Sequence, residues 1–149
     1  MSTASSMAAE RLLVDTWGWL ALADDREPRH AGVRRVLTDA WGTGGSVVTT
    51  DYILDETFTL VFRRLPFLKA RRFVTTIDRG EEDRSLEIER IVPERFARAK
   101  ALRLRFRDKP LISFTDLTTM VVMQELRITR VVTADAHFRH VGLGFDPVP

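Results

Sequence analysis

Residues 11–20, RLLVDTWGWL, contain the pattern that decides the fold of this chain. The apolar run LLV is typical of a short buried strand, and Asp15 follows it directly. Residues 16–23 then continue as a helix rich in apolar side chains, including Trp17 and Leu20. The stretch therefore predicts a strand that passes straight into a helix, with an acid at the junction.

The same alternation of strand and helix recurs along the rest of the chain. We expect further strands at residues 46–49, 86–91, 130–133 and 144–148, and helices at 30–41, 51–65, 67–79, 93–107 and 115–126. Apolar and charged residues alternate in the strand at 86–91, which places it near an edge of the sheet. Strands that alternate with helices pair in parallel through right-handed crossovers. The sequence therefore predicts an α/β fold: a three-layer α/β/α sandwich with a central parallel sheet of about five strands.

Size and composition are those of one ordinary globular domain. Of the 149 residues, 44% are hydrophobic and 30% are charged. We expect residues 10–149 to form a single domain and residues 1–9 to form a flexible tail. The tail lacks the apolar segment of a secretory signal, and no apolar run is long enough to span a membrane. The absence of cysteine excludes disulfides and thiol catalysis, and it is compatible with a cytoplasmic location.

Four acids stand where a strand gives way to a helix, or on the helix that follows. They are Asp15, Glu56, Asp116 and Asp135. The carboxyl ends of parallel strands meet at one edge of the sheet, so these acids are expected to converge there. Acids that cluster without matching bases require a cation, and divalent metal ions prefer oxygen ligands. The pattern therefore points to metal-assisted phosphodiester hydrolysis.

Three of these acids also have a purely structural interpretation. Asp15 is a favoured helix N-cap residue. Ser113 and Asp116 have the spacing of a capping box, although the helix that Asp116 opens is apolar almost all round. Asp135 could cap the short turn at residues 136–139. Each acid alone is weak evidence for a metal site, and the hypothesis depends on all four acids lying close together.

The fourth acid, Glu56, lies inside a helix rather than at its start. At about 100° per residue it falls beside Ile53 and Leu60, at the border of the apolar stripe. Its neighbour Asp55 points further outward. We therefore expect Glu56, and not Asp55, to turn back toward the sheet.

Basic residues are concentrated in two helical stretches, although the net charge is only +2. Such stretches can follow a phosphate backbone, and the alternative is a solvated helix face. The first stretch contains no acid. The residues that we expect to contact a polyanionic substrate are Arg63, Arg64, Lys69, Arg71 and Arg72 in the first stretch and Arg103 and Arg105 in the second.

Other chemistries fit the sequence less well. There is no phosphate-binding P-loop and no G-x-S-x-G nucleophile motif. The glycines at residues 42–45 precede a strand, whereas a dinucleotide fingerprint follows one. His137 and His140 are three residues apart, and a surface histidine pair explains them better than a metal-free ribonuclease site.

Taken in order, these motifs resemble the PIN-domain ribonucleases, and most closely the VapC-type toxins of toxin–antitoxin pairs. The family pattern is a strand ending in Asp, a Glu on the helix after the second strand, an Asp opening a late buried helix, and T-x-D-x-x-F after the fourth strand. The matching residues here are Val14-Asp15-Thr16, Glu56, Thr115-Asp116 and Thr133-Ala134-Asp135-Ala136-His137-Phe138.

The resemblance implies a cytoplasmic, metal-dependent endoribonuclease that acts as the toxin of a type II pair. It implies that the four acids bind Mg²⁺ or Mn²⁺, with Thr16 and Thr133 as supporting hydroxyl groups. It also implies an RNA substrate such as tRNA or rRNA, a homodimer, and a cognate antitoxin that wraps the helices of the toxin. Two alternatives stay open: a non-toxin PIN nuclease of RNA processing, and a catalytically inactive PIN module that binds RNA or protein.

Overall fold

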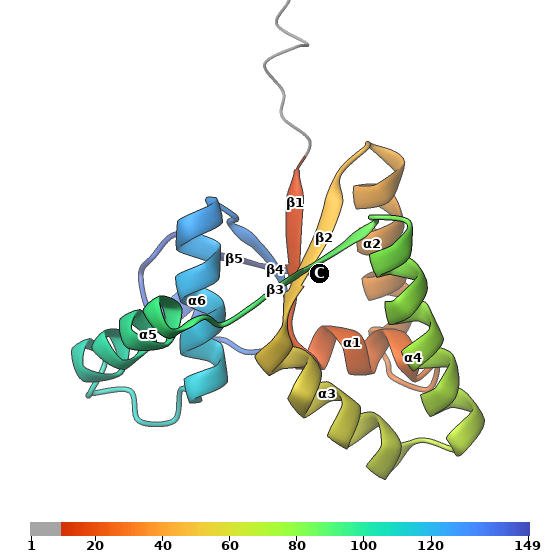
Figure 1. Cartoon of the computed structure of the whole chain (residues 1–149), viewed down its shortest axis with the longest axis horizontal. Helices are drawn as coiled ribbons and strands as arrows, with labels where there is room; N and C mark the ends of the chain where they lie inside the picture. Colours follow the sequence, from red (N-terminus) through yellow and green to blue (C-terminus); the bar gives the residue numbers. More distant parts are fainter. Residues whose placement is uncertain (1–9) are drawn as a thin grey trace, which may run out of the picture.

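The computed structural model describes residues 10–149, which fold around one five-stranded sheet (Figure 1). All strand pairs are parallel, and the order across the sheet is β3-β2-β1-β4-β5. This confirms the predicted parallel sheet, with β3 at an edge. The strands are β1 (Arg11–Val14), β2 (Ser46–Thr50), β3 (Leu86–Glu89), β4 (Arg130–Val132) and β5 (Asp146–Val148).

Helices cover both faces of the sheet, as the predicted three-layer architecture requires. In Figure 1, α5 and α6 lie on one side, and α1, α2 and α4 lie on the other. Helix α3 follows β2 and contacts both α1 and α6, so it connects the two layers at the lower end of the view. The helices are α1 (Thr16–Ala23), α2 (His30–Gly42), α3 (Asp51–Arg64), α4 (Phe67–Glu82), α5 (Pro93–Arg105), α6 (Phe114–Leu126) and α7 (His137–His140).

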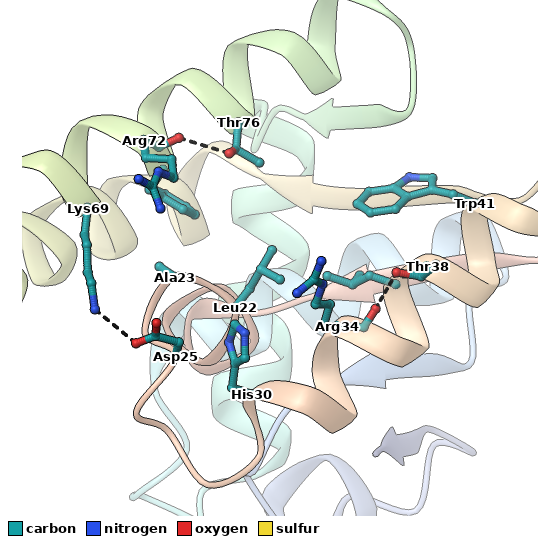
Figure 2. Close-up of a pocket in the computed structure, with 12 residues that line it drawn as sticks. Leu22, Ala23, Asp25, His30, Arg34, Thr38, Trp41, Lys69, Arg72 and Thr76 are labelled. Carbon is teal, nitrogen blue, oxygen red and sulfur yellow. Dashed lines mark hydrogen bonds and ion pairs between the residues drawn. The ribbon is translucent and has the colours of Figure 1, made fainter.

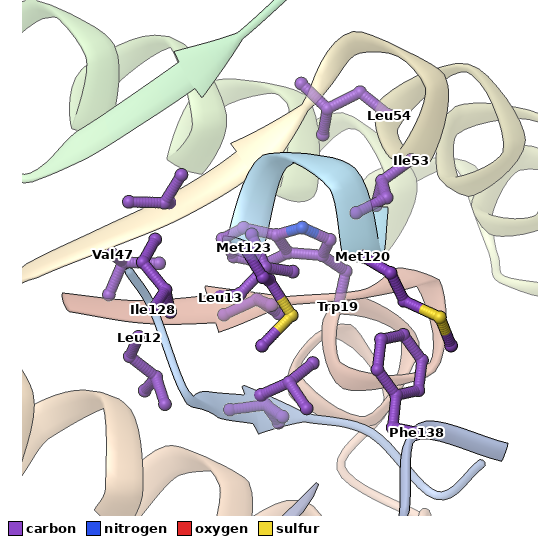
Figure 3. Close-up of a cluster of buried hydrophobic side chains, with 14 of the residues drawn as sticks. Leu12, Leu13, Trp19, Val47, Ile53, Leu54, Met120, Met123, Ile128 and Phe138 are labelled. Carbon is purple, nitrogen blue, oxygen red and sulfur yellow. The ribbon is translucent and has the colours of Figure 1, made fainter. Parts of the chain in front are cut away.

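The core packs α1 and α6 against the central strand (Figure 3). Leu13 of β1, Trp19 of α1 and Met120 of α6 are each at most 2% exposed. Burial of side chains of this size stabilises the fold by about 1.5–3 kcal/mol each. The tight core fixes the relative positions of the β1 end, the α6 start and the segment after β4.

One helix runs further than the sequence predicts. We expected a helix over residues 67–79 with a turn at Gly80, but α4 continues through Gly80 to Glu82. A Cβ at Gly80 would lie 2.9 Å from the Cβ of Leu86 in β3. Gly80 is therefore a close-packing position between α4 and β3, and it is not a helix stop.

The two tryptophans of α1 differ in burial, as expected for residues two apart on a short helix. Trp19 is in the core and donates from Nε1 to Thr49 Oγ1 at 3.0 Å. Trp17 is half-buried, with the Arg29 guanidinium 5.7 Å from its ring centroid.

The expected tail at residues 1–9 lies outside the described residues. Within residues 10–149, no helix has the length and apolar character needed to cross a bilayer.

Candidate metal centre

Asp15 is held rigidly at the carboxyl end of β1. Its backbone N–H donates to Val132 O of β4 at 3.2 Å, and its Oδ1 accepts from Gly18 N at 3.0 Å as the N-cap of α1. The carboxylate is 6% exposed. Asp15 can therefore be both the N-cap of α1 and a member of the acidic site, because the capping hydrogen bond leaves one carboxylate oxygen for another partner.

Gly18 contributes to this arrangement, and the sequence analysis did not single it out. A Cβ at Gly18 would lie 2.8 Å from Val132 O and 2.8 Å from Val14 Cγ1. Only glycine lets the first turn of α1 approach β1 and β4 this closely. The signal was present in the sequence as a glycine three residues after the acid, inside an otherwise apolar helix.

Asp116 and Asp135 come from different elements and meet at the same edge of the sheet. Asp116 is in the first turn of α6, where its backbone N–H donates to Ser113 Oγ at 3.0 Å as the capping box predicted. Asp135 follows β4, and its backbone N–H donates to Thr133 Oγ1 at 3.0 Å. The two carboxyl groups are close enough to share a hydrogen bond.

The third member of this cluster is His137. Ligand atoms of Asp116, Asp135 and His137 all lie within 4.8 Å of one another. His137 opens α7, and its backbone N–H donates to Asp135 Oδ1 at 2.8 Å. From the sequence, His137 was expected to form a surface pair with His140. The overlooked signal is the spacing of two residues between His137 and an Asp that follows a strand.

The three acids influence the pKa values of one another. Burial raises the pKa of Asp15 to about 7, despite hydrogen bonds from Thr133 and Gly18. Burial, together with the hydrogen bond to Asp135 and its charge, raises the pKa of Asp116 to about 8. Burial also acts to raise the pKa of Asp135, but hydrogen bonds from Asp116 and His137 hold it below its ordinary value. At neutral pH, Asp116 therefore holds a proton that Asp135 shares.

This arrangement fits a divalent cation. Among residues 10–149, no lysine or arginine forms an ion pair with Asp15, Asp116 or Asp135. Two carboxylates that must share a proton can both ionise when a cation lies between them. Carboxylate oxygens are suitable ligands for Mg²⁺ and Mn²⁺.

Glu56 is placed differently from the other three acids. It lies on α3, which begins at the end of β2, but its side chain is exposed. Asp55 is exposed as well, and exposure alone does not distinguish the directions of the two side chains. The described residues give Glu56 no hydrogen bond or ion pair, and it is not part of the cluster around Asp116. Its predicted role as a ligand stays a prediction.

The predicted basic residues fall into two groups. Arg63, Arg64, Arg71, Arg72 and Arg105 are exposed on α3, α4 and α5. Lys69 pairs with Asp25 at 3.0 Å. The Arg103 guanidinium donates to the backbone carbonyls of Phe106, Lys109 and Ile112. Arg103 therefore fixes the α5–α6 loop, and its guanidinium is already occupied within the fold.

A separate cavity of about 570 Å³ lies between α1, α2 and α4 (Figure 2). Leu22 and Phe73 contribute apolar surface, while Arg34, Arg72 and Trp41 line it with two guanidinium groups and an indole. None of the four predicted acids lines this cavity. It is therefore a second feature of the surface, distinct from the acidic cluster.

Comparisons with known proteins bear on the family and the fold of this chain. A model of the PIN domain family matches residues 12–143. Among solved structures, Mycobacterium tuberculosis VapC20, a sarcin–ricin loop cleaving toxin, is 25% identical with a TM-score of 0.73, over 88% of this chain and 95% of that chain. VapBC2 from Rickettsia felis, bound to a DNA fragment from its promoter, is 14% identical with a TM-score of 0.71, over 93% and 99% of the two chains. No curated protein sequence gives a significant match.

The likeness to VapBC2 bears on the fold alone, whereas the family match covers the segments that hold all four predicted acids. The resemblance seen in the sequence motifs is therefore confirmed. This chain belongs to the PIN domain family.

Proposed function

We propose that this protein is a metal-dependent endoribonuclease and the toxin of a type II toxin–antitoxin pair. One observation supports this most strongly: Asp15, Asp116 and Asp135 lie near one another at the carboxyl edge of the sheet, and among residues 10–149 no lysine or arginine forms an ion pair with them. The likeness to a toxin that cleaves an RNA loop supports the same substrate class. We propose a looped RNA, such as a segment of tRNA or rRNA, as the substrate.

The acids would hold Mg²⁺ or Mn²⁺ at this edge. Asp15 and Asp116 would be the principal ligands, with Asp135 and Glu56 completing the site. When bound, the metal would supply Lewis-acid stabilisation of the phosphate and a water of lowered pKa. Asp116 would release its shared proton to solvent when the site holds a metal, because the bound form requires ionised carboxylates.

Each of these acids has a supporting group in the protein. Gly18 N–H fixes one oxygen of Asp15, and the Thr133 hydroxyl donates to the same carboxyl group. Thr133 Oγ1 also accepts the backbone N–H of Asp135, so one side chain supports two acids. These two contacts support the proposed role of Thr133. Thr16, the other predicted hydroxyl, lies next to Asp15 in the first turn of α1.

The exposed arginines of α3, α4 and α5 would receive the RNA backbone. Arg63 and Arg64 lie in the last turn of α3, the same helix that holds Glu56. Exposed positive charge on these helices would offset the repulsion between a polyanion and an acidic cluster. Cleavage should therefore fall steeply as salt concentration rises.

We further propose that the cavity between α1, α2 and α4 receives a segment of the antitoxin. Its apolar lining suits apolar side chains of a partner, and Arg34 and Arg72 suit acidic groups on the same segment. Trp41 is 37% exposed at the cavity, where an aromatic ring can anchor a partner.

The resemblance also supports a homodimer, which light scattering of the purified protein would test.

The experiment that tests the proposed function is cleavage of a labelled RNA pool with Mn²⁺ or with EDTA. The wild type should cut only with metal, and Asp116→Asn should not cut. Asp55→Asn, a change of the same kind at an exposed acid of α3, is the matched control and should cut normally. Metal-independent cutting, or full activity of Asp116→Asn, would contradict the proposal. RNA binding without cutting, for wild type and variants alike, would favour the inactive binding module.

A further inference from the structure

His137 is positioned by the chain to face the acidic cluster. It follows Asp135 by two residues, and its backbone N–H donates to Asp135 Oδ1 at 2.8 Å. This tight turn brings the imidazole back toward the same carboxylate, with Nδ1 2.9 Å from Oδ1. The side chain is 29% exposed, so most of the ring is covered by protein.

The ring nitrogen nearest the acids contacts a carboxylate oxygen. Nδ1 lies 2.9 Å from Asp135 Oδ1, so the two groups form an ion pair when the imidazole is protonated, although the approach falls outside hydrogen-bond geometry. When the imidazole is neutral with its free lone pair on Nδ1, two acceptor atoms face each other at this distance and repel. A bound cation that both atoms contact would remove this repulsion.

The spacing of the ligand atoms suits one ion. Oxygen and nitrogen ligands lie about 2.0–2.2 Å from a small divalent ion, so two ligands on opposite sides of the same ion are about 4.0–4.4 Å apart. The ligand atoms of Asp116, Asp135 and His137 lie within 4.8 Å of one another. A small side-chain adjustment would therefore let a single ion contact both carboxylates and one ring nitrogen.

We propose that His137 is a direct nitrogen ligand of the metal and that it makes the site prefer Mn²⁺ over Mg²⁺. This inference rests on the proposed metal site and extends it to a residue outside the four acids. Mg²⁺ prefers oxygen ligands, whereas imidazole nitrogen is a better ligand for transition metals. Loss of the imidazole should therefore weaken Mn²⁺ binding much more than Mg²⁺ binding.

Titration calorimetry with MnCl₂ and with MgCl₂, on the wild type and His137→Ala, tests this preference. His137→Ala keeps the backbone N–H that holds Asp135, so the two carboxylates stay in place. We expect Mn²⁺ affinity to fall at least tenfold and Mg²⁺ affinity to change by less than about threefold. His140→Ala is the matched control, since His140 is exposed at the other end of the same short helix. An equal loss for both metals, or no loss for either, would overturn the proposal.

Pulsed electron paramagnetic resonance of bound Mn²⁺ provides a second, direct readout. In protein with ¹⁵N-labelled histidine, a ligand imidazole gives a ¹⁵N coupling to the manganese. We expect this coupling in the wild type and in His140→Ala, and its loss in His137→Ala. Bound Mn²⁺ without any histidine coupling would overturn the role of His137 and leave the acidic site intact. A wild type that binds neither metal would overturn the metal site itself and the proposed function with it.

Discussion

The acids at the ends of the strands and the acid on α3 are placed in contrasting ways. Asp15 is fixed by hydrogen bonds to backbone groups of the strand–helix junction, and Asp135 by a turn directly after β4. Glu56 lies one and a half turns into a helix and is exposed. An acid at a strand end inherits its position from the sheet, whereas an acid in the middle of a helix depends on side-chain conformation and on what binds nearby.

The largest expected effect concerns Asp116, the acid in the first turn of α6 that shares a hydrogen bond with the strand-end acid Asp135. Asp116→Asn should reduce RNA cleavage by about a thousandfold or more, because it removes a carboxylate on which the site depends. The melting temperature without metal should not fall, because the amide removes a buried acid whose ionisation is unfavourable. Cleavage rates and thermal melting of the same preparation check both points. A folded variant with normal activity would show that the cluster of Asp116 and Asp135 is not the reacting group.

Glu56→Gln tests how much the exposed acid on α3 contributes to cleavage. An exposed acid that contributes only when metal and RNA are bound should matter less, so we expect a loss of about 10- to 100-fold. Cleavage kinetics across a range of Mn²⁺ concentrations would show whether higher metal restores the rate. Asp55→Asn is the control on the same helix and should have no effect. A loss as large as that of Asp116→Asn would remove the distinction between the two kinds of acid.

Sequence reasoning was strongest where local chemistry decides the structure. An apolar run followed by a capping residue identified β1 and Asp15, and a capping residue followed by an apolar helix identified α6 and Asp116. Both patterns depend on residues that are adjacent in the sequence. Reasoning from helical angles separated Glu56 from Asp55; both side chains are exposed, so burial does not test the predicted difference in orientation.

Long-range contacts were out of reach of the sequence. Arg103 looked like part of a basic surface, but its guanidinium meets three carbonyls of a loop whose path only the fold determines. His137 was read as the helical neighbour of His140, whereas the turn after Asp135 sets its direction. In both cases the charge or ring was visible in the sequence, and the partner was not.

Gly18→Ala tests whether the backbone of the junction sets the position of Asp15. A Cβ there meets Val132 O and Val14 Cγ1 at 2.8 Å, so α1 must move away from the sheet. We expect a loss of about 1–3 kcal/mol in the free energy of unfolding, as overpacking usually costs, together with weaker metal binding. Chemical denaturation and calorimetry would measure the two effects. Gly42→Ala is the control, because a Cβ at that residue meets nothing within 4 Å. Equal effects of the two changes would argue against a positioning role for Gly18.

The pH dependence of stability tests the electrostatic side of the comparison. Without metal, the pKa values of Asp15 and Asp116 are raised to about 7 and about 8, whereas in the unfolded chain they are near 3.9. A raised pKa in the folded state stabilises the protein at low pH, and this contribution is lost as pH rises from about 4 toward 8. The melting temperature in EDTA should therefore decline over this window.

Asp116→Asn should make this decline shallower, because one of the two raised groups no longer titrates. The lowered pKa of Asp135 acts in the opposite direction, and its contribution is lost only as pH falls below the ordinary range of an Asp. Saturating Mn²⁺ should reverse the slope above pH 6, since the ion binds the ionised carboxylates that are otherwise unfavourable. Equal slopes of melting temperature against pH for wild type and variant would mean that burial does not hinder the ionisation of Asp116. The contrast between the two regions would then be one of position, without any difference in electrostatics.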